Sequence, residues 1–198
     1  MNDRTPGSHG EERVATGPVS DETLVGRVAV GDRMAFALLV RRHADRFLAM
    51  AERVLGDRTE AEDVLQDAFS RFWVHAGRFD PKAARFTTWF YRVVANACTD
   101  RLRRRGRTRP LPEGWDTADE GTVGAEAAIA QTQQAVAVRR ALDGLPARQR
   151  LAVTLCYYED LTNREAADIL GVSVKALESL LVRARRQLRT TLVAEVDR

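Results

Sequence analysis

The side chains that could do chemistry in this chain are mainly arginines, lysines and carboxylates at helical spacing, and the most ordered group lies in residues 162–189. Thr162 and Glu165 form a capping-box pattern that predicts the start of a helix. Gly171 suits the left-handed residue that ends it, and Ser173 is typical of the cap of a second helix. This second helix carries five basic residues and one acid: Lys175, Glu178, Arg183, Arg185, Arg186 and Arg189. The stretch predicts a helix-turn-helix whose basic second helix enters a DNA major groove; the alternative is a packing unit with a solvated surface.

A second polar group lies in residues 86–105, which have the pattern of one helix. Four side chains at steps of four, three and four residues share an exposed stripe: Arg92, Asn96, Thr99 and Arg103. Phe86 and Tyr91 stand beside it near the helix start, where aromatic rings next to basic and amide groups can stack on unpaired bases. Core packing is the alternative for aromatic residues here, and we favour it for Trp89 and Phe90. Residues 101–109 then contain six arginines and no acid, which indicates contact with nucleic acid or a solubilising segment.

A third group lies on the helix expected over residues 60–76, whose start we assign to a capping box of Thr59 and Glu62. One face of this helix is apolar and would face the core. The other face is mainly acidic and polar: Glu62, Asp63, Gln66, Asp67 and Arg71. We interpret it as a docking surface for a basic partner, with simple solvation as the alternative.

The composition excludes several classes of protein. With 198 residues, 30% of them charged and a net charge of +3, the chain is expected to be globular and soluble. It has no apolar run long enough to span a membrane and no apolar signal core, which predicts a cytoplasmic location. The three histidines, His9, His43 and His75, do not cluster, and no zinc spacing or phosphate-binding glycine loop occurs. Cys98 and Cys156 are expected to be buried thiols. Taken together, these observations lead us to expect no metal, no cofactor and no enzyme activity.

The periodicity predicts an all-α fold of two small helical domains joined by a flexible acidic linker, the C-terminal one a helix-turn-helix domain. We expect residues 1–19 to be disordered, 20–106 to form the first domain, 107–130 the linker and 131–194 the second domain. The helices before the helix-turn-helix are expected at these positions: about 20–31, 32–55, 60–76, 87–105, 125–142 and 145–158.

Three stretches together resemble the extracytoplasmic-function (ECF) group of bacterial RNA polymerase sigma factors. They are AEDVLQDAFSRFW at 61–73, FTTWFYRVVANACTDRLRRR at 86–105 and the stretch from Leu145 to Arg189 that ends in the helix-turn-helix. The resemblance implies a promoter-specificity subunit of the polymerase, with sigma region 2 in residues 20–106 and sigma region 4 in residues 131–194. It implies no catalysis and no cofactor.

The resemblance also implies a role for each polar group. Asp63, Gln66 and Asp67 fall on the positions that bind the clamp helices of core polymerase. The side chains matched to −10 recognition and melting are Phe86, Arg92, Asn96 and Arg103. Those matched to −35 recognition are Thr162, Arg164, Ser173, Lys175, Glu178, Ser179, Arg183 and Arg186. Glu178 and Leu180 depart from the basic residues that many relatives have at these positions.

Partners follow from the same resemblance. They are core RNA polymerase, through its clamp helices and flap, promoter DNA, and an anti-sigma factor, with membrane contact only through a membrane-bound anti-sigma factor. The acidic linker would lie in the RNA path of the polymerase. Two other classes stay open on the residues alone: a free-standing helix-turn-helix repressor or activator that binds duplex DNA as a dimer, and an enzyme acting on nucleic acid.

Overall fold

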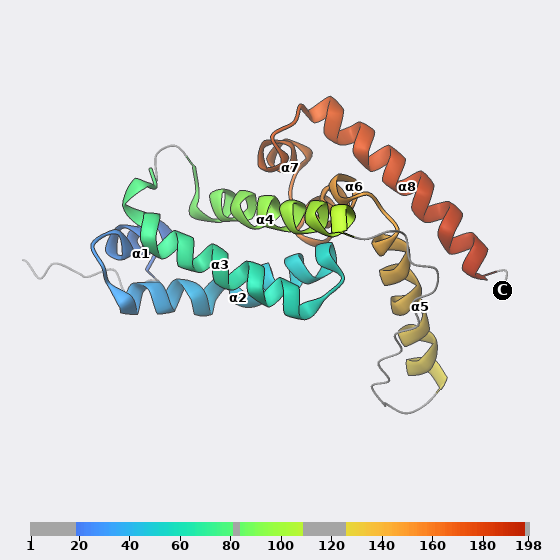
Figure 1. Ribbon diagram of the computed structural model, residues 1–198, viewed down its shortest axis with the longest axis horizontal. Helices are drawn as coiled ribbons and strands as arrows, with labels where there is room; N and C mark the ends of the chain where they lie inside the picture. The colour runs from blue at the N-terminus through green and yellow to red at the C-terminus, as the bar shows by residue number, and fades with distance from the viewer. Residues whose placement is uncertain (1–18, 81–83, 109–125, 197–198) are drawn as a thin grey trace, which may run out of the picture.

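The computed structural model describes residues 19–80, 84–108 and 126–196, and every regular element in these ranges is helical (Figure 1). In chain order the elements are α1 (Asp21–Ala29), α2 (Arg33–Leu55), α3 (Arg58–His75), the short 3-10 turn η1 (Ala76–Arg78), α4 (Phe86–Thr108), α5 (Glu126–Asp143), α6 (Ala147–Val153), the π-helical turn η2 (Thr154–Tyr158), α7 (Asn163–Leu170) and α8 (Val174–Val196). The expected all-α class is confirmed. Among the described helices, none is long and apolar enough to cross a membrane.

The first half is a bundle in which α2, α3 and α4 lie side by side, with α1 against one end (Figure 1). Its centre is aromatic: Phe47, Phe72, Phe86 and Phe90 are fully buried. The ring centroids of Phe47 and Phe90 are 4.7 Å apart, and those of Phe72 and Phe86 are 5.0 Å apart. Such pairs add roughly 0.5–1.5 kcal/mol each beyond the area they bury. The aromatic centre therefore fixes how α3 and α4, which carry two of the polar groups, lie relative to each other.

Side-chain caps set where the helices of this bundle begin. Asp32 caps α2, since its Oδ1 accepts from the backbone N–H groups of Met34 (2.9 Å) and Ala35 (3.0 Å). Asp57 caps α3, because its Oδ1 accepts from the Glu60 N–H at 2.9 Å. The predicted Thr59 capping box is therefore wrong: α3 starts earlier, and Thr59 already lies inside the helix. Asp57 and Thr59 are both residue types that favour the N-cap position, and α3 uses Asp57.

The helix-turn-helix forms as its local signals predict. Thr162 Oγ1 accepts from the Glu165 N–H (3.3 Å), and Glu165 Oε2 accepts from the Thr162 N–H (3.0 Å), which completes the capping box. Gly171 ends α7 with φ 63°, in the left-handed region. Ser173 Oγ accepts from the Ala176 N–H at 3.2 Å at the start of α8. Leu177 in the first part of α8 is fully buried, and α8 packs against both α7 and α6.

The two halves touch extensively. α7 lies beside α4 (Figure 1). η2 and α6 contact α2, and one continuous cluster of buried apolar side chains runs through both halves. The turn η2 joins α6 to the helix-turn-helix, and in it the Glu159 N–H donates to the Thr154 carbonyl at 3.1 Å. The expected linker of residues 107–130 overlaps the end of α4 and the start of α5; residues 109–125 lie outside the described residues, as do residues 1–18 of the expected disordered N-terminus.

Candidate functional site

The polar face of α3 is exposed as expected. Its apolar face, with Val64, Leu65, Ala68, Phe69 and Phe72, enters the core, and the side chains of Asp63, Gln66 and Asp67 stay exposed. Asp63 is not free, however: its Oδ2 pairs with the Arg101 guanidinium of α4 at 3.0 Å. Arg101 also pairs with Glu60 at 3.4 Å. Among the three predicted docking residues, Asp63 therefore has a structural partner within the chain.

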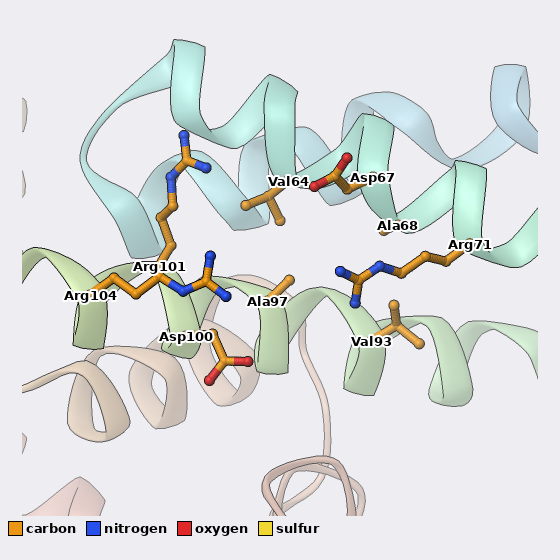
Figure 2. Close-up of a pocket in the computed structure, with 9 residues that line it drawn as sticks. All are labelled: Val64, Asp67, Ala68, Arg71, Val93, Ala97, Asp100, Arg101 and Arg104. Atoms are coloured by element: carbon orange, nitrogen blue, oxygen red, sulfur yellow. The ribbon is translucent and has the colours of Figure 1, made fainter.

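A shallow groove runs between α3 and α4 beside this face (Figure 2). Its floor is apolar, with Val64, Ala68, Val93 and Ala97, and its rim is charged, with Asp67, Arg71, Asp100, Arg101 and Arg104. Figure 2 shows the side chains of Arg71 and Arg104 extending toward the middle of the groove from opposite ends. An apolar floor inside a ring of both charge signs suits a protein surface that carries an apolar side chain among charged ones.

The predicted stripe on α4 is exposed at Arg92, Asn96 and Arg103. Arg103 pairs with Asp100 at 3.1 Å on the same helix, a pair exposed enough to be exchanged easily for a phosphate. Arg92 Nη2 donates to the Asp168 carbonyl of α7 at 2.7 Å. The stripe is therefore exposed at these three residues, and at Arg92 the guanidinium is also bonded to the second half.

Phe86 does not belong to this exposed set. Its side chain has no exposed surface, and its ring packs against Phe72, Phe90 (centroids 5.4 Å apart) and His43 (5.5 Å). The prediction that Phe86 contacts −10 DNA is corrected by this placement: a ring inside the core cannot stack on a base. Phe86 instead anchors the first turn of α4.

The predicted duplex-reading residues of the helix-turn-helix are all exposed. They are Thr162, Arg164, Ser173, Lys175, Glu178, Ser179, Arg183 and Arg186. Lys175, Ser179 and Arg183 follow one another at four-residue steps along α8 and thus form one stripe. Thr162 and Ser173 are used as helix caps, so their hydroxyl groups are already partly satisfied.

Sequence reasoning missed Glu159, which follows η2 and is only 5% exposed. Its carboxylate accepts from the Tyr91 hydroxyl at 2.6 Å and from Arg46 Nε at 2.9 Å, and Arg53 lies 3.6 Å away. Burial, followed by the hydrogen bond to Glu159, raises the pKa of the Tyr91 phenol well above its usual value, so this group stays a donor. The hydrogen bond to Glu159 likewise raises the pKa of Arg46. No local signal marks Glu159, because its partners lie far away in the sequence.

A second buried charge, Arg150 of α6, also joins the halves. It is 6% exposed, and its Nη1 donates to the Val54 carbonyl of α2 at 2.8 Å and to Asp143 Oδ1 at 2.9 Å. Its Nη2 donates to the Asp143 carbonyl. Burial lowers the pKa of this guanidinium from its usual value. Arg150 thereby satisfies a carbonyl at the end of α2 from the opposite half of the molecule.

The described residues contain no group of three or more histidine, cysteine, aspartate or glutamate side chains that could hold a metal ion. Both Cys98, which is buried, and Cys156, which is half-buried, are free thiols. Burial raises the pKa of Cys98 to about 12, so the thiol is unreactive. His43 lies at the core boundary, with Nε2 2.7 Å from Asp21 Oδ2. What the arrangement offers is therefore a set of binding faces on α3, α4 and α8.

Comparison with known proteins accounts for these faces. The family model of Sigma-70 region 2 matches residues 39–108, and that of Sigma-70, region 4 matches residues 135–188, together more than half of the chain. The ECF RNA polymerase sigma factor SigM of Mycobacterium tuberculosis is 37% identical over 87% of this chain and 85% of its own length. The ECF RNA polymerase sigma factor SigE of Mycolicibacterium smegmatis is 36% identical over 83% of this chain, which spans 65% of that relative.

Among solved structures, that of CnrH in complex with the cytosolic domain of CnrY is similar at 31% identity and a TM-score of 0.62, over 88% of this chain and 97% of that one. The two matched regions carry the three exposed faces: region 2 holds those of α3 and α4, and region 4 holds that of α8. A chain with both regions in this order and this degree of identity belongs to the ECF RNA polymerase sigma factors, a non-enzymatic family of transcription initiation.

Proposed function

We propose that this chain binds core RNA polymerase and directs it to promoters through two DNA-reading faces, one in each sigma-70 region. The exposed stripe on α8 carries the proposal, because it follows a capped, rigid turn in the segment that matches region 4. Lys175 and Arg183 suit guanine O6 and N7 in the major groove of a −35 element, and Glu178 can accept from a cytosine amine. Ser179 lies between them on the same stripe. Contacts of Thr162, Arg164, Ser173 and Arg186 with phosphates would fix the register.

The second face, on α4, reads the −10 element of the promoter. Asn96 and Arg103 are exposed along one side of the helix, and Arg92 continues the line toward the helix start. Guanidinium and amide groups in such a row can follow the backbone of one melted strand. Flipping a base out of the duplex costs a few kcal/mol, so a short element is best read where this row meets the loop before α4. The aromatic residue that we expected to stack there, Phe86, supports the helix from inside.

The third face, on α3, docks on the clamp helices of core polymerase. Gln66 and Asp67 are exposed beside the groove of Figure 2, and they supply the direct contacts. Asp63 contributes by exchanging Arg101 for a basic residue of the polymerase. Such an exchange keeps the carboxylate paired in both states, so its net effect on affinity is smaller than that of Asp67.

Asp67→Ala is expected to weaken association with core polymerase by about tenfold, as befits the loss of one interfacial ion pair. Asp45→Ala is the matched control: it removes the same charge from an exposed position on α2, away from the groove. Co-purification with core polymerase and its salt dependence measure the difference. Equal retention of both variants would remove Asp67 from the docking surface.

Two domains fit these roles, a region 2 domain in residues 20–106 and a region 4 domain in residues 131–194. The linker between them, proposed over residues 107–130, is acidic, with five carboxylates and no lysine or arginine between Pro112 and Glu126. This charge would keep it away from DNA and suit the RNA path and flap side of the polymerase.

An anti-sigma factor and a cytoplasmic location complete the proposal. CnrH, whose fold this chain shares at 31% identity, was solved with the cytosolic domain of another protein, CnrY, which supports a protein partner of this kind. A membrane-bound anti-sigma factor would be the route by which this chain meets a membrane.

A free-standing helix-turn-helix regulator is the main competing function, and it explains the α8 stripe equally well. Run-off transcription with core polymerase and a library of promoter fragments separates the two. We expect specific initiation only when this chain and core polymerase are both present, and weak duplex binding by the chain alone. Tight, specific duplex binding by the isolated chain, with no effect on the polymerase, would refute the sigma mechanism for it.

A further inference from the structure

The contact between the two halves is centred on the carboxylate of Glu159. This side chain comes from the segment between η2 and α7 in the second half, yet its carboxylate bonds to side chains of the first half: Arg46 and Arg53 on α2 and Tyr91 on α4. Arg46 also donates through Nη2 to the Glu159 carbonyl at 3.1 Å. Arg53 in addition stacks on the Tyr158 ring, with its guanidinium carbon 4.7 Å from the ring centroid.

These contacts exist only while the halves are together. A carboxylate whose side chain is 3% exposed is stable as an anion only when cations and donors surround it. Separation of the halves would return Glu159 to water and leave Arg46 and Arg53, whose side chains are already 51% and 37% exposed, without this carboxylate. The group of Glu159, Arg46, Arg53 and Tyr91, which we name the Glu159 latch, therefore stabilises the closed arrangement specifically.

In the closed arrangement, α7 engages one end of the α4 face and leaves the α8 face open. α7 lies beside α4, and the Asp168 carbonyl in its last turn accepts from Arg92. The carboxyl end of a helix attracts a cation, so α7 holds Arg92 in the place where a phosphate would otherwise lie. In the same arrangement, Lys175, Ser179 and Arg183 of α8 remain exposed.

We propose that the Glu159 latch holds the helix-turn-helix against α4 and so autoinhibits strand binding on the −10 face while the −35 face stays accessible. This inference rests on the proposed role of Arg92 in holding the −10 strand. Release of the latch frees Arg92 from the Asp168 carbonyl and removes α7 from the side of α4.

Glu159→Gln tests the latch, because it keeps the shape of the side chain and removes its charge. Asp160→Asn is the control: it removes the same charge one residue away, at an exposed position whose φ of 53° asparagine tolerates well. Arg46→Gln opens the latch from the other half, at a side chain that is 51% exposed and so leaves the core intact. Thermal melts followed by circular dichroism check that each full-length variant is folded.

Two measurements are made on each variant: the radius of gyration by small-angle X-ray scattering, and the affinity for a fluorescent single-stranded DNA of about 20 random nucleotides, by anisotropy. We expect Glu159→Gln and Arg46→Gln to expand the protein and to tighten strand binding by about tenfold, because removing one partner of a largely buried ion pair is destabilising, less so here since Arg46 is half exposed. Asp160→Asn should change neither value. An unchanged radius of gyration in both latch variants would overturn the inference, and so would expansion without tighter strand binding.

Arg92→Ala in the Glu159→Gln background separates this inference from the function on which it rests. If the expanded double variant loses the gain in strand binding, both stand. If it expands and keeps the full gain, the latch stands as a closing contact and the proposed role of Arg92 at the −10 strand fails, which also overturns the claim that the latch acts by masking Arg92.

Discussion

Gly56 and Gly171 form a natural pair for measuring how strongly the halves pack. Both end a helix in the left-handed region, with φ of 71° and 63°. An alanine in this conformation costs roughly 1–2 kcal/mol of stability. A methyl group on Gly171 would meet no atom within 4 Å, so Gly171→Ala should lower the free energy of unfolding by about that backbone amount alone.

At Gly56 the same methyl would lie 2.7 Å from Oδ1 of Asp143, which belongs to the other half. The carboxylate must swing away, and its 2.9 Å bond to Arg150 Nη1 is lost. A hydrogen bond to a charged group contributes about 1.5–3 kcal/mol, and less here because the Asp143 side chain is 43% exposed. Gly56→Ala should therefore destabilise by about 2–4 kcal/mol in total, clearly more than Gly171→Ala.

Guanidinium titration followed by helical circular dichroism gives both values, provided that the transition is two-state. In an Asp143→Ala background the methyl group meets no carboxylate, so Gly56→Ala should then cost only the backbone part, about 1–2 kcal/mol. Equal costs at Gly56 and Gly171 in the natural background would refute the reasoning, since they would mean that Asp143 does not lie against the end of α2 in solution.

Three further outcomes are expected. Phe86→Ala should destabilise the protein by about 3–5 kcal/mol in thermal or chemical unfolding, because it empties a fully buried site, whereas an unchanged melt with a −10 defect would return Phe86 to the DNA face. Arg183→Ala should reduce transcription from a promoter whose −10 element alone is altered, because the −35 contact is still there to be lost. On a promoter whose −35 element is already altered, the same substitution should have no further effect. Equal losses on the two promoters would disprove the assignment of Arg183 to −35. The hydrogen bonds from Thr162 hold the pKa of Glu165 below its ordinary 4.5, so the stability that this carboxylate contributes is present above about that pH and falls as the pH drops through the lowered pKa. Glu165→Gln should flatten that acid-side loss in melts taken across this range, and an identical pH profile for both proteins would count against the capping box in solution.

The parts of the fold that the sequence predicts are those governed by neighbours in the chain. The capping box at Thr162, the left-handed Gly171 and the cap at Ser173 all act within a few residues, so the helix-turn-helix could be placed closely. The start of α3 was missed by two residues because Asp57 and Thr59 carry competing signals of the same kind. Element ends are the least determined feature of a periodic pattern.

The parts that the sequence does not predict depend on distant contacts. Phe86 reads equally well as an exposed aromatic residue or as a core residue until Phe72 and Phe90 are known to surround it. Glu159 pairs with Arg46 and Tyr91, 113 and 68 residues away, and nothing in its local sequence distinguishes it from a solvated acid. Binding faces on single helices could therefore be predicted from spacing, whereas the contact of α7 with the α4 face could not.

The number of residues in the π-helical turn η2 affects the direction in which the helix-turn-helix leaves α6. Such a turn holds one residue more than an α-helical one, as the bond from the Glu159 N–H to the Thr154 carbonyl records. Deleting one residue from Thr154–Tyr158 would let the same N–H and carbonyl groups close an ordinary α-helical bond, so Glu159 should keep its direction toward Arg46. Inserting a further residue has no such outlet: in a regular helix it would rotate everything that follows by about 100° about the helix axis and turn Glu159 away from Arg46. The contact between the halves should therefore tolerate the loss of one residue in this turn better than the gain of one, a difference that comparison of side chains alone would overlook.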